Sequence, residues 1–319
     1  MLLPLAIPSP DVSSFQIGPF NIAFYALCLM TGMVVARIWA GTRLTKRGGE
    51  PGVALDFTLW AIGLGIVGAR IYHVITHAGD YFGPGKNLIE VIRIDHGGIA
   101  IFGGLIGGAV GVLIASRLTG VRFWSFADAL VPGLLLAQAV GRLGNWFNNE
   151  LFGGPTTLPW GLEISSSNPA FPVGLPEGTL FHPTFLYEMI WNIAGIVVLL
   201  AIERKLRPRW GTFFAMYLVW YGIGRAWIES LRVDPSFIIL GMRTNVLAAL
   251  LIILLGIVIF IVQRRLHPGV ETSVYLPGRG NSEAVTDQLT RDPDKYFQVL
   301  NSKNTVSSED ELTASIDRK

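Results

Sequence analysis

The chain has 319 residues, of which 51% are hydrophobic and only 15% are charged. Soluble domains carry about 25% charged residues, so this composition excludes an ordinary soluble protein. The single cysteine, Cys28, excludes an intrachain disulfide and a cysteine-rich metal site. The net charge of +2 does not identify a partner until the charges are assigned to the two sides of a membrane.

Seven apolar segments approach the length of about 20 residues that crosses the hydrocarbon core of a bilayer. We therefore predict an all-α polytopic membrane protein with seven transmembrane helices. The predicted helices occupy residues 20–40, 54–77, 97–116, 124–142, 184–203, 210–231 and 244–263.

Basic residues predict the orientation of these helices. Twelve of them lie at or just after the ends of the first, third, fifth and seventh predicted helices, whereas the alternate loops hold four. Because Lys and Arg concentrate in cytoplasmic loops, the N-terminus is expected outside and the C-terminus inside the cell. The expected location is the cytoplasmic (inner) membrane of a bacterium.

Two segments lie outside the predicted helices. The outer loop 146–183 contains aromatic residues, four prolines and several glycines, which predicts an ordered cap on the outer face. Residues 267–319 are polar and mixed in charge, so we predict a disordered cytoplasmic tail. Residues 1–266, including the outer loop, are expected to form one transmembrane catalytic domain.

The third predicted helix has glycines at spacings of three and four residues. These are Gly103, Gly104, Gly107, Gly108 and Gly111. Small residues at such spacings let a neighbouring membrane helix approach closely, so we expect a tight helix pair here.

Ionisable residues within the predicted helices indicate where a site lies. Arg70, Arg142, Glu188, Arg225 and Glu229 all fall in the outer half of the membrane in the predicted orientation. A charge at mid-membrane costs roughly 2.5–3.5 kcal/mol or more, so each group needs a partner or a cavity. Surplus arginine at one depth is suited to phosphate, because guanidinium groups bind phosphate oxygens with two parallel hydrogen bonds.

The sixth predicted helix carries a polar stripe. Tyr221, Arg225, Glu229 and Arg232 follow one another at spacings of four, four and three and so share one face. A polar face of a membrane helix turns toward the protein interior. An Arg225–Glu229 pair that only neutralises itself is the alternative interpretation.

The segment from Gly141 to Gly153, GRLGNWFNNELFG, closes the fourth predicted helix. Its glycines allow close backbone approach, and its polar side chains supply hydrogen-bond donors and acceptors at the interface. A helix C-cap is the alternative, with Gly144 or Asn145 in the left-handed conformation, but a cap needs only one or two such residues.

At these residues the chain resembles bacterial prolipoprotein diacylglyceryl transferases over about residues 12–266. The family signature Gly-Arg-x-Gly-Asn-Phe-x-Asn-x-Glu-x-x-Gly matches Gly141–Gly153, with Trp146 in place of the phenylalanine. The blocks around Tyr25, Gly68-Ala69-Arg70, His182-Pro183 and the polar stripe match as well.

The resemblance implies transfer of a diacylglyceryl group from phosphatidylglycerol to the lipobox cysteine thiol of a prolipoprotein. A thioether forms, glycerol phosphate is released, and neither metal nor cofactor is required. The expected partners are phosphatidylglycerol, membrane lipid and prolipoprotein signal peptides, but no nucleic acid. The active site is expected toward the outer leaflet.

The resemblance also implies roles for individual residues. Arg142 and Arg225 would hold the lipid phosphate. The expected catalytic residues are Arg142, Arg225, Tyr221 and Glu229. The expected substrate-binding residues are Arg142, Asn145, Asn148, Glu150, Gly153, Tyr25, Arg70, Glu188 and Arg232.

One position departs from the family pattern. Many members have a histidine, proposed as catalytic, where this chain has Phe102. Either that histidine is dispensable, or Tyr221, His73 or Glu229 performs its task.

Three other classes of protein compete with a transferase. A lipid transporter predicts polar groups in the inner half of the membrane and an internal repeat. A retinal protein predicts a lysine in the last helix, and a scaffold leaves the intramembrane arginines unexplained. The sequence shows neither polar groups continuing into the inner half nor an internal repeat, and its last predicted helix has no lysine.

Overall fold

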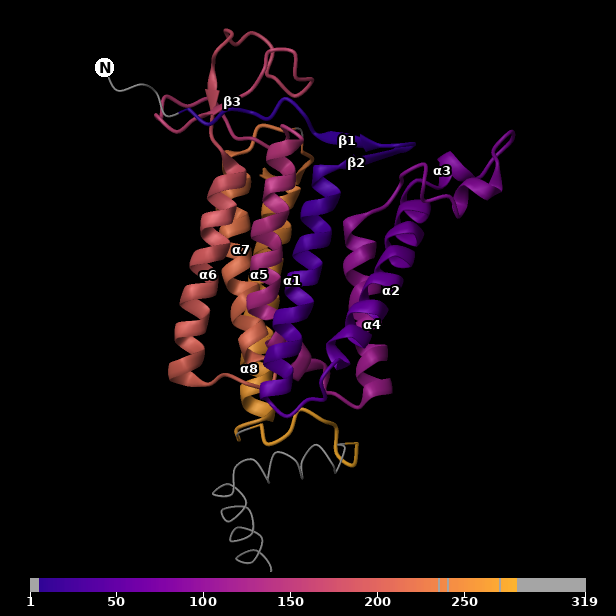
Figure 1. Cartoon of the computed structure of the whole chain (residues 1–319), viewed down its shortest axis with the longest axis vertical. Helices are drawn as coiled ribbons and strands as arrows, with labels where there is room; N and C mark the ends of the chain where they lie inside the picture. The colour runs from indigo at the N-terminus through magenta and orange to yellow at the C-terminus, as the bar shows by residue number, and fades with distance from the viewer. Residues whose placement is uncertain (1–5, 235, 240, 270, 280–319) are drawn as a thin grey trace, which may run out of the picture.

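A computed structural model describes residues 6–234, 236–239, 241–269 and 271–279. These residues form a mostly helical protein (Figure 1). The long helices are α1 Phe24–Lys46, α2 Val53–Thr76, α4 Ile101–Thr119, α5 Phe123–Phe147, α6 Thr184–Leu206, α7 Thr212–Leu231 and α8 Thr244–Leu266. The short elements are α3 Ala78–Tyr81, η1 Leu88–Val91 and the strands β1 Ser14–Ile17, β2 Phe20–Ala23, β3 Leu162–Glu163, β4 Leu180–Phe181, β5 Ile238–Ile239 and β6 Met242–Arg243.

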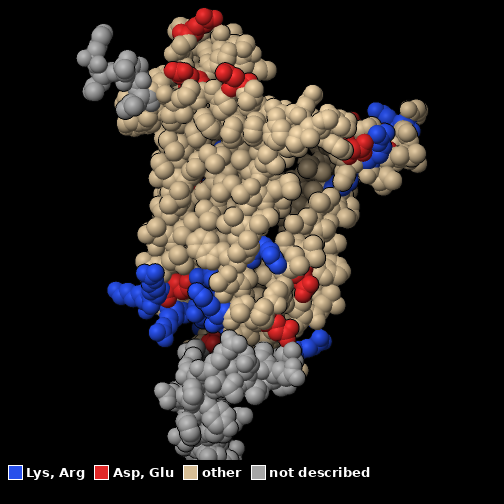
Figure 2. All heavy atoms as spheres, in the orientation of Figure 1, with Lys and Arg blue, Asp and Glu red and all other residues tan. Residues whose placement is uncertain are grey.

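Six of the long helices are long and apolar enough to cross a membrane. The helix α7 is not among them, because Arg225 and Glu229 make the half nearer the cap polar. On the face shown in Figure 2 the middle of the bundle forms a broad belt without charged side chains, and Lys and Arg gather at its lower end. The protein is therefore a polytopic helical membrane protein.

The first long helix begins four residues later than the sequence predicts. Residues 14–23 form an antiparallel hairpin in which Ser14 pairs with Ala23 and Ile17 with Phe20. Gly18 makes the tight turn possible, because its φ of 58° lies in the left-handed region that favours glycine. The hairpin runs across the end of the bundle beside the cap (Figure 1).

The helices α2 and α4 form a close pair, as their glycines predict. A Cβ atom on Gly68 would lie only 2.9 Å from the Cα atom of Gly107, so the two backbones touch there. Figure 1 shows this pair beside the remaining long helices, with the α3–η1 connection extending from its upper end.

The helix α5 is the centre of the remaining bundle and packs against α1 and α6. Its Asp128 is fully buried and caps the start of α7, not of its own helix. The Asp128 carboxylate accepts hydrogen bonds from Gly211 N at 2.9 Å and Phe214 N at 2.8 Å. Gly211 is the N-cap residue of α7 and Phe214 lies in its first turn, where N–H groups lack partners within the helix.

The loop after α5 forms a cap with its own small core. The strands β3 and β4 pair, and Phe152, Leu162, Ile164 and Phe181 are buried around them. The N-terminal segment joins this cap, because Ile7 N donates to Gly161 O and Ile7 O accepts from Glu163 N, both at 2.9 Å.

The segment after α8 packs against the opposite end of the bundle. Val274 and Tyr275 are buried in the same cluster as Leu44 and Phe57. The disordered tail was expected to begin at residue 267, but packing continues through residues 271–279 because these two apolar side chains are buried. The rest of the expected tail, 280–319, lies outside the described residues.

Candidate active site

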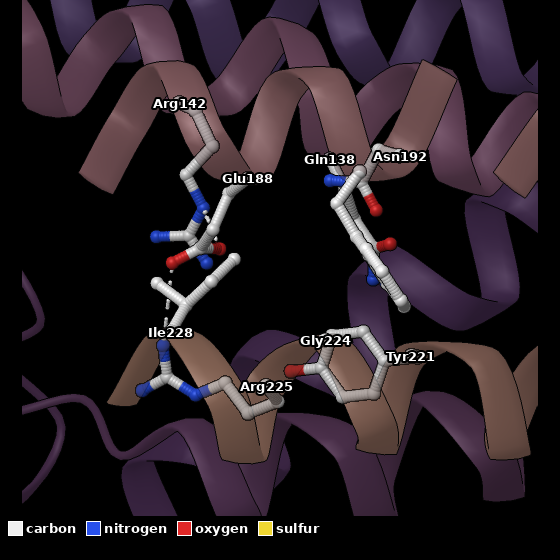
Figure 3. A pocket seen from close by; sticks show the side chains of 9 residues that line it. Gln138, Arg142, Glu188, Asn192, Tyr221, Gly224, Arg225 and Ile228 are labelled. Carbon is white, nitrogen blue, oxygen red and sulfur yellow. Dashed lines mark ion pairs between the residues drawn. The ribbon is translucent and has the colours of Figure 1, made fainter. Parts of the chain in front are cut away.

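A partly enclosed cavity of about 60 Å³ lies between α5, α6 and α7 in the half of the bundle nearer the cap. Figure 3 shows its polar lining: Gln138 and Arg142 from α5, Glu188 and Asn192 from α6, and Tyr221 and Arg225 from α7. Four of these residues were expected site residues, namely Arg142, Glu188, Tyr221 and Arg225. Gln138 and Asn192 were not.

Glu188 lies between the two arginines of the cavity (Figure 3). Its Oε2 atom is 2.5 Å from Arg142 Nε, and its Oε1 atom is 3.6 Å from Arg225 Nη1. One carboxylate thus faces two guanidinium groups. The exposed fractions of these side chains are only 11% for Glu188, 22% for Arg142 and 17% for Arg225, which weakens solvent screening of their charges.

Arg225 Nη1 is buried and has no hydrogen-bond partner within the described residues. Buried donors are almost always satisfied, so a donor without a partner beside a cavity suits a ligand oxygen. Charged donors form the strongest such hydrogen bonds. The electrostatics and the geometry of the cavity therefore both favour an anionic ligand.

Glu229 is fully buried one turn beyond Arg225 and does not line the cavity. Its carboxylate lies 2.9 Å from Arg225 Nη2, 3.4 Å from Arg232 Nη1 and 2.9 Å from Arg243 Nη2. Asn245 Nδ2 donates to it at 2.9 Å. Glu229 therefore orients Arg225, and the simple alternative of an isolated Arg225–Glu229 pair is wrong.

Arg243 and Asn245 are members of this network that the sequence prediction missed. Arg243 is the last residue of β6 and precedes α8 directly, and Asn245 lies in the first turn of α8. The signal available was weak: an arginine and an asparagine just before a strongly apolar helix resemble an ordinary helix start.

The expected signature residues form a chain that leads from the cavity to the cap. Arg142 Nη1 donates to Asn145 Oδ1 at 3.0 Å, and Asn145 Nδ2 donates to Glu150 Oε1 at 2.8 Å. Asn148 Nδ2 donates to the same Glu150 atom at 3.3 Å. The helix extends to Phe147, so the segment is not a helix C-cap centred on Gly144 or Asn145.

Two signature glycines are required by close contacts. A Cβ atom on Gly144 would lie 3.1 Å from Tyr25 Cα, so Tyr25 packs against the signature segment. A Cβ atom on Gly153 would lie 3.0 Å from Leu231 O, and Gly153 forms a β-bridge with Arg232. Gly153 therefore joins the end of the signature to the end of α7.

Arg70 does not join the other arginines. It is buried and donates to the carbonyl oxygens of Val91 at 2.9 Å, Gly97 at 2.7 Å and Gly98 at 2.8 Å, and also to Glu90 O. These bonds hold the connection between α2 and α4. The sequence predicts Arg70 at the same membrane depth as Arg142 and Arg225. It does not share their site, because it belongs to the separate α2–α4 pair.

The remaining candidates for proton transfer differ in position. Phe102 is 49% exposed, and neither it nor His73 lines the cavity. The His73 ring stacks on His77 with centroids 4.3 Å apart. Of the three alternatives to a histidine at position 102, Tyr221 alone lies on the cavity as the structure describes it.

The fold and the cavity define the chain as a helical membrane protein with a buried arginine–glutamate site beneath a folded cap. A family model described as prolipoprotein diacylglyceryl transferase matches residues 13–262. The chain belongs to this family of transferases.

Relatives match nearly the whole chain. A protein of Leifsonia xyli subsp. xyli is 55% identical over 307 residues, which are 92% of each chain. A protein of Bifidobacterium longum (strain NCC 2705) is 44% identical over 313 residues, 94% of this chain and 97% of its own. Both relatives are named phosphatidylglycerol–prolipoprotein diacylglyceryl transferase.

Proposed function

We propose that this chain transfers the diacylglyceryl group of phosphatidylglycerol to a prolipoprotein, the first step of lipoprotein maturation. The names of its relatives support both substrates. The observation that carries the proposal is the pair Arg142 and Arg225 around the single carboxylate of Glu188, with a buried donor of Arg225 left unpaired. This arrangement suits the phosphate of an anionic lipid.

The proposed topology has seven membrane spans, with α7 included. Although α7 is less apolar than the other six, it packs along α8 and against α6 over the membrane belt, so its polar side faces protein. In this topology the cap lies outside and the ends of α1, α4, α6 and α8 lie in the cytoplasm, which the distribution of basic residues supports. The cavity then lies on the side of the outer leaflet of a bacterial cytoplasmic membrane.

The proposed reaction is attack of the lipobox cysteine on the glycerol carbon that bears the phosphate. A thiol with a pKa near 8.5 is only partly ionised at neutral pH, and the field of the arginines raises the thiolate fraction. The thiol proton goes to water. A C–S bond forms, the C–O bond to phosphate breaks, and glycerol phosphate leaves with the bonding electron pair.

Arg142 and Arg225 have the same task before and after this step. They hold the phosphate diester, and they stabilise the additional charge that develops on its oxygen as the C–O bond breaks. Tyr221 is placed to donate a hydrogen bond to the same phosphate. Asn145, Asn148 and Glu150 hold Arg142, while Glu229 and Arg232 hold Arg225, so these five act as positioning residues.

The test uses purified protein, labelled phosphatidylglycerol and a peptide that contains a lipobox cysteine. The wild-type chain should yield a thioether-linked diacylglyceryl peptide. Arg142→Ala and Arg225→Ala should each lower the rate by at least about 100-fold, because each removes a charged donor from the developing charge.

Arg93→Ala is the matched control, since Arg93 is 41% exposed in the connection between α2 and α4. It should retain the wild-type rate. Thermal unfolding of all variants separates lost chemistry from lost folding. A folded Arg142→Ala or Arg225→Ala variant with full activity would refute the phosphate role, and no thioether product from the wild type would refute the function.

A further inference from the structure

A groove runs along the outside of the bundle between α6 and α8, with α7 as its floor. The helix α7 packs against both neighbours, whereas α6 and α8 make no extensive contact with each other. The part of the groove within the membrane belt is a hollow of about 340 Å³. Aliphatic and aromatic side chains line it, among them Ile202, Val219 and Ile257.

The same groove ends in a basic hollow at the end of the bundle opposite the cap. This hollow measures about 600 Å³ and is lined by Arg207, Arg209 and Arg264. Met216 and Phe260 line both hollows, so the basic end and the apolar part are continuous. A basic end joined to an apolar channel has the chemical pattern of an anionic lipid.

The arginines of the basic hollow differ in their partners. Arg209 lies 3.1 Å from the carboxylate of Glu203. Arg207 and Arg264 have no ion pair among the residues that the structure describes. Glu271 also lines the hollow, but its carboxylate already accepts hydrogen bonds from Ser125 Oγ and, at 3.5 Å, from Trp210 N. Two positive charges are thus available to a ligand.

The length of the groove matches one leaflet. Its lining on α7 extends from Thr212 to Ile223, which at 1.5 Å per residue is about 16 Å along the helix. Half of the hydrocarbon core is about 15 Å thick. A lipid whose phosphate lies at the basic end could therefore lay one acyl chain along the whole groove.

We propose that this groove binds one anionic phospholipid of the leaflet opposite the cap. Its phosphate lies between Arg207 and Arg264, and one of its acyl chains fills the space between α6 and α8. Loop charges that set the orientation of a membrane protein account for arginines at this end, but not for an apolar groove that ends among them. The site is separate from the cavity of Arg142 and does not depend on the proposed transferase reaction.

The test is photo-crosslinking of the full chain in phosphatidylcholine nanodiscs. The probe is phosphatidic acid with a diazirine on one acyl chain, and peptide mass spectrometry locates the label. We expect labelling concentrated on the groove residues of α6, α7 and α8. Unlabelled phosphatidic acid should compete, whereas phosphatidylcholine and soluble glycerol 3-phosphate should not.

The charge variant is Arg207→Gln with Arg264→Gln, which should weaken competition by phosphatidic acid about 30-fold. The matched control is Lys46→Gln with Arg117→Gln, which removes two exposed charges from the same end of the bundle but outside the groove. This control should label like the wild type. Ile257→Trp fills the groove without a change of charge and should also abolish groove labelling.

Three results would overturn the proposal. One is label spread evenly over all lipid-facing helices. The second is equal competition by glycerol 3-phosphate, which would indicate an anion site without lipid. The third is unchanged groove labelling in a folded charge variant or, if that variant does not fold, in Ile257→Trp.

Discussion

Glu188 occupies the position between Arg142 and Arg225 that a lipid phosphate would share in the proposed reaction. Without ligand, its carboxylate keeps two buried guanidinium groups from lying side by side uncompensated. A second anion that enters the cavity must therefore compete with Glu188. The residue holds the arginines in place and at the same time limits how tightly they bind phosphate.

The variant Glu188→Gln separates these two effects. Its amide oxygen can still accept from Arg142 Nε, but the competing charge is gone. We expect the KM for phosphatidylglycerol to fall about tenfold, equivalent to roughly 1.4 kcal/mol. We also expect a lower kcat, because the arginines are held less firmly. Initial rates in mixed micelles give both constants.

Glu177→Gln is the control, since Glu177 is an exposed residue of the cap loop. Its KM should equal that of the wild type. A KM that is unchanged or raised in Glu188→Gln would show that Glu188 does not compete with the lipid phosphate.

The sequence predicted part of this network and missed part of it. Arg142, Glu188 and Arg225 could be found because ionisable residues within apolar segments need partners. Arg243 could not be assigned to Glu229, because a loop residue has no helical phase that indicates its neighbour. Arg70 was expected in the same cluster, since the sequence gives its depth but not which helices pack together.

At the level of elements, the α2–α4 pair is held by backbone contact. Gly68 meets Gly107 so closely that a single methyl group on Gly68 has no space. Membrane helices gain little from the hydrophobic effect between them, so packing at such contacts contributes much of their association.

Gly68→Ala should therefore separate α2 from α4 and lower the free energy of unfolding by about 1–3 kcal/mol. Gly63→Ala is the matched control on the same helix, because nothing lies within 4 Å of a Cβ atom there. It should leave stability unchanged or raise it by up to about 1 kcal/mol. Unfolding in mixed detergent measures both. Equal stability of the two variants would contradict close packing at Gly68.

Helix positions were predicted better than helix ends. Apolar length located all seven long helices, but α5 continues five residues past its predicted end at Arg142. The reason is that Gly144 does not end the helix but makes room for Tyr25 of α1. The β1–β2 hairpin was missed because its apolar residues extend the apolar pattern of the first helix.

For the whole molecule, the distribution of basic residues predicts which end faces the cytoplasm. Two engineered cysteines in a Cys28→Ser background test this orientation. Val173→Cys lies on the fully exposed surface of the cap, and Lys205→Cys lies at the exposed end of α6. A membrane-impermeant maleimide should label Val173→Cys in intact spheroplasts and Lys205→Cys only after lysis. The reverse pattern would invert the proposed topology.

Residues 271–279 connect three loops at the end of the bundle opposite the cap. Tyr275 Oη accepts from Glu50 N at 2.8 Å, Leu276 N donates to Gly120 O at 2.7 Å, and Glu271 accepts from Trp210 N at 3.5 Å. Each loop lies earlier in the chain than this segment. The ribosome makes the chain from its N-terminus. The hydrogen bonds between these loops and residues 271–279 can therefore form only after all seven long helices have been synthesised. Closure of this end is therefore among the last steps of biogenesis, and a chain that stops after α8 would lack it.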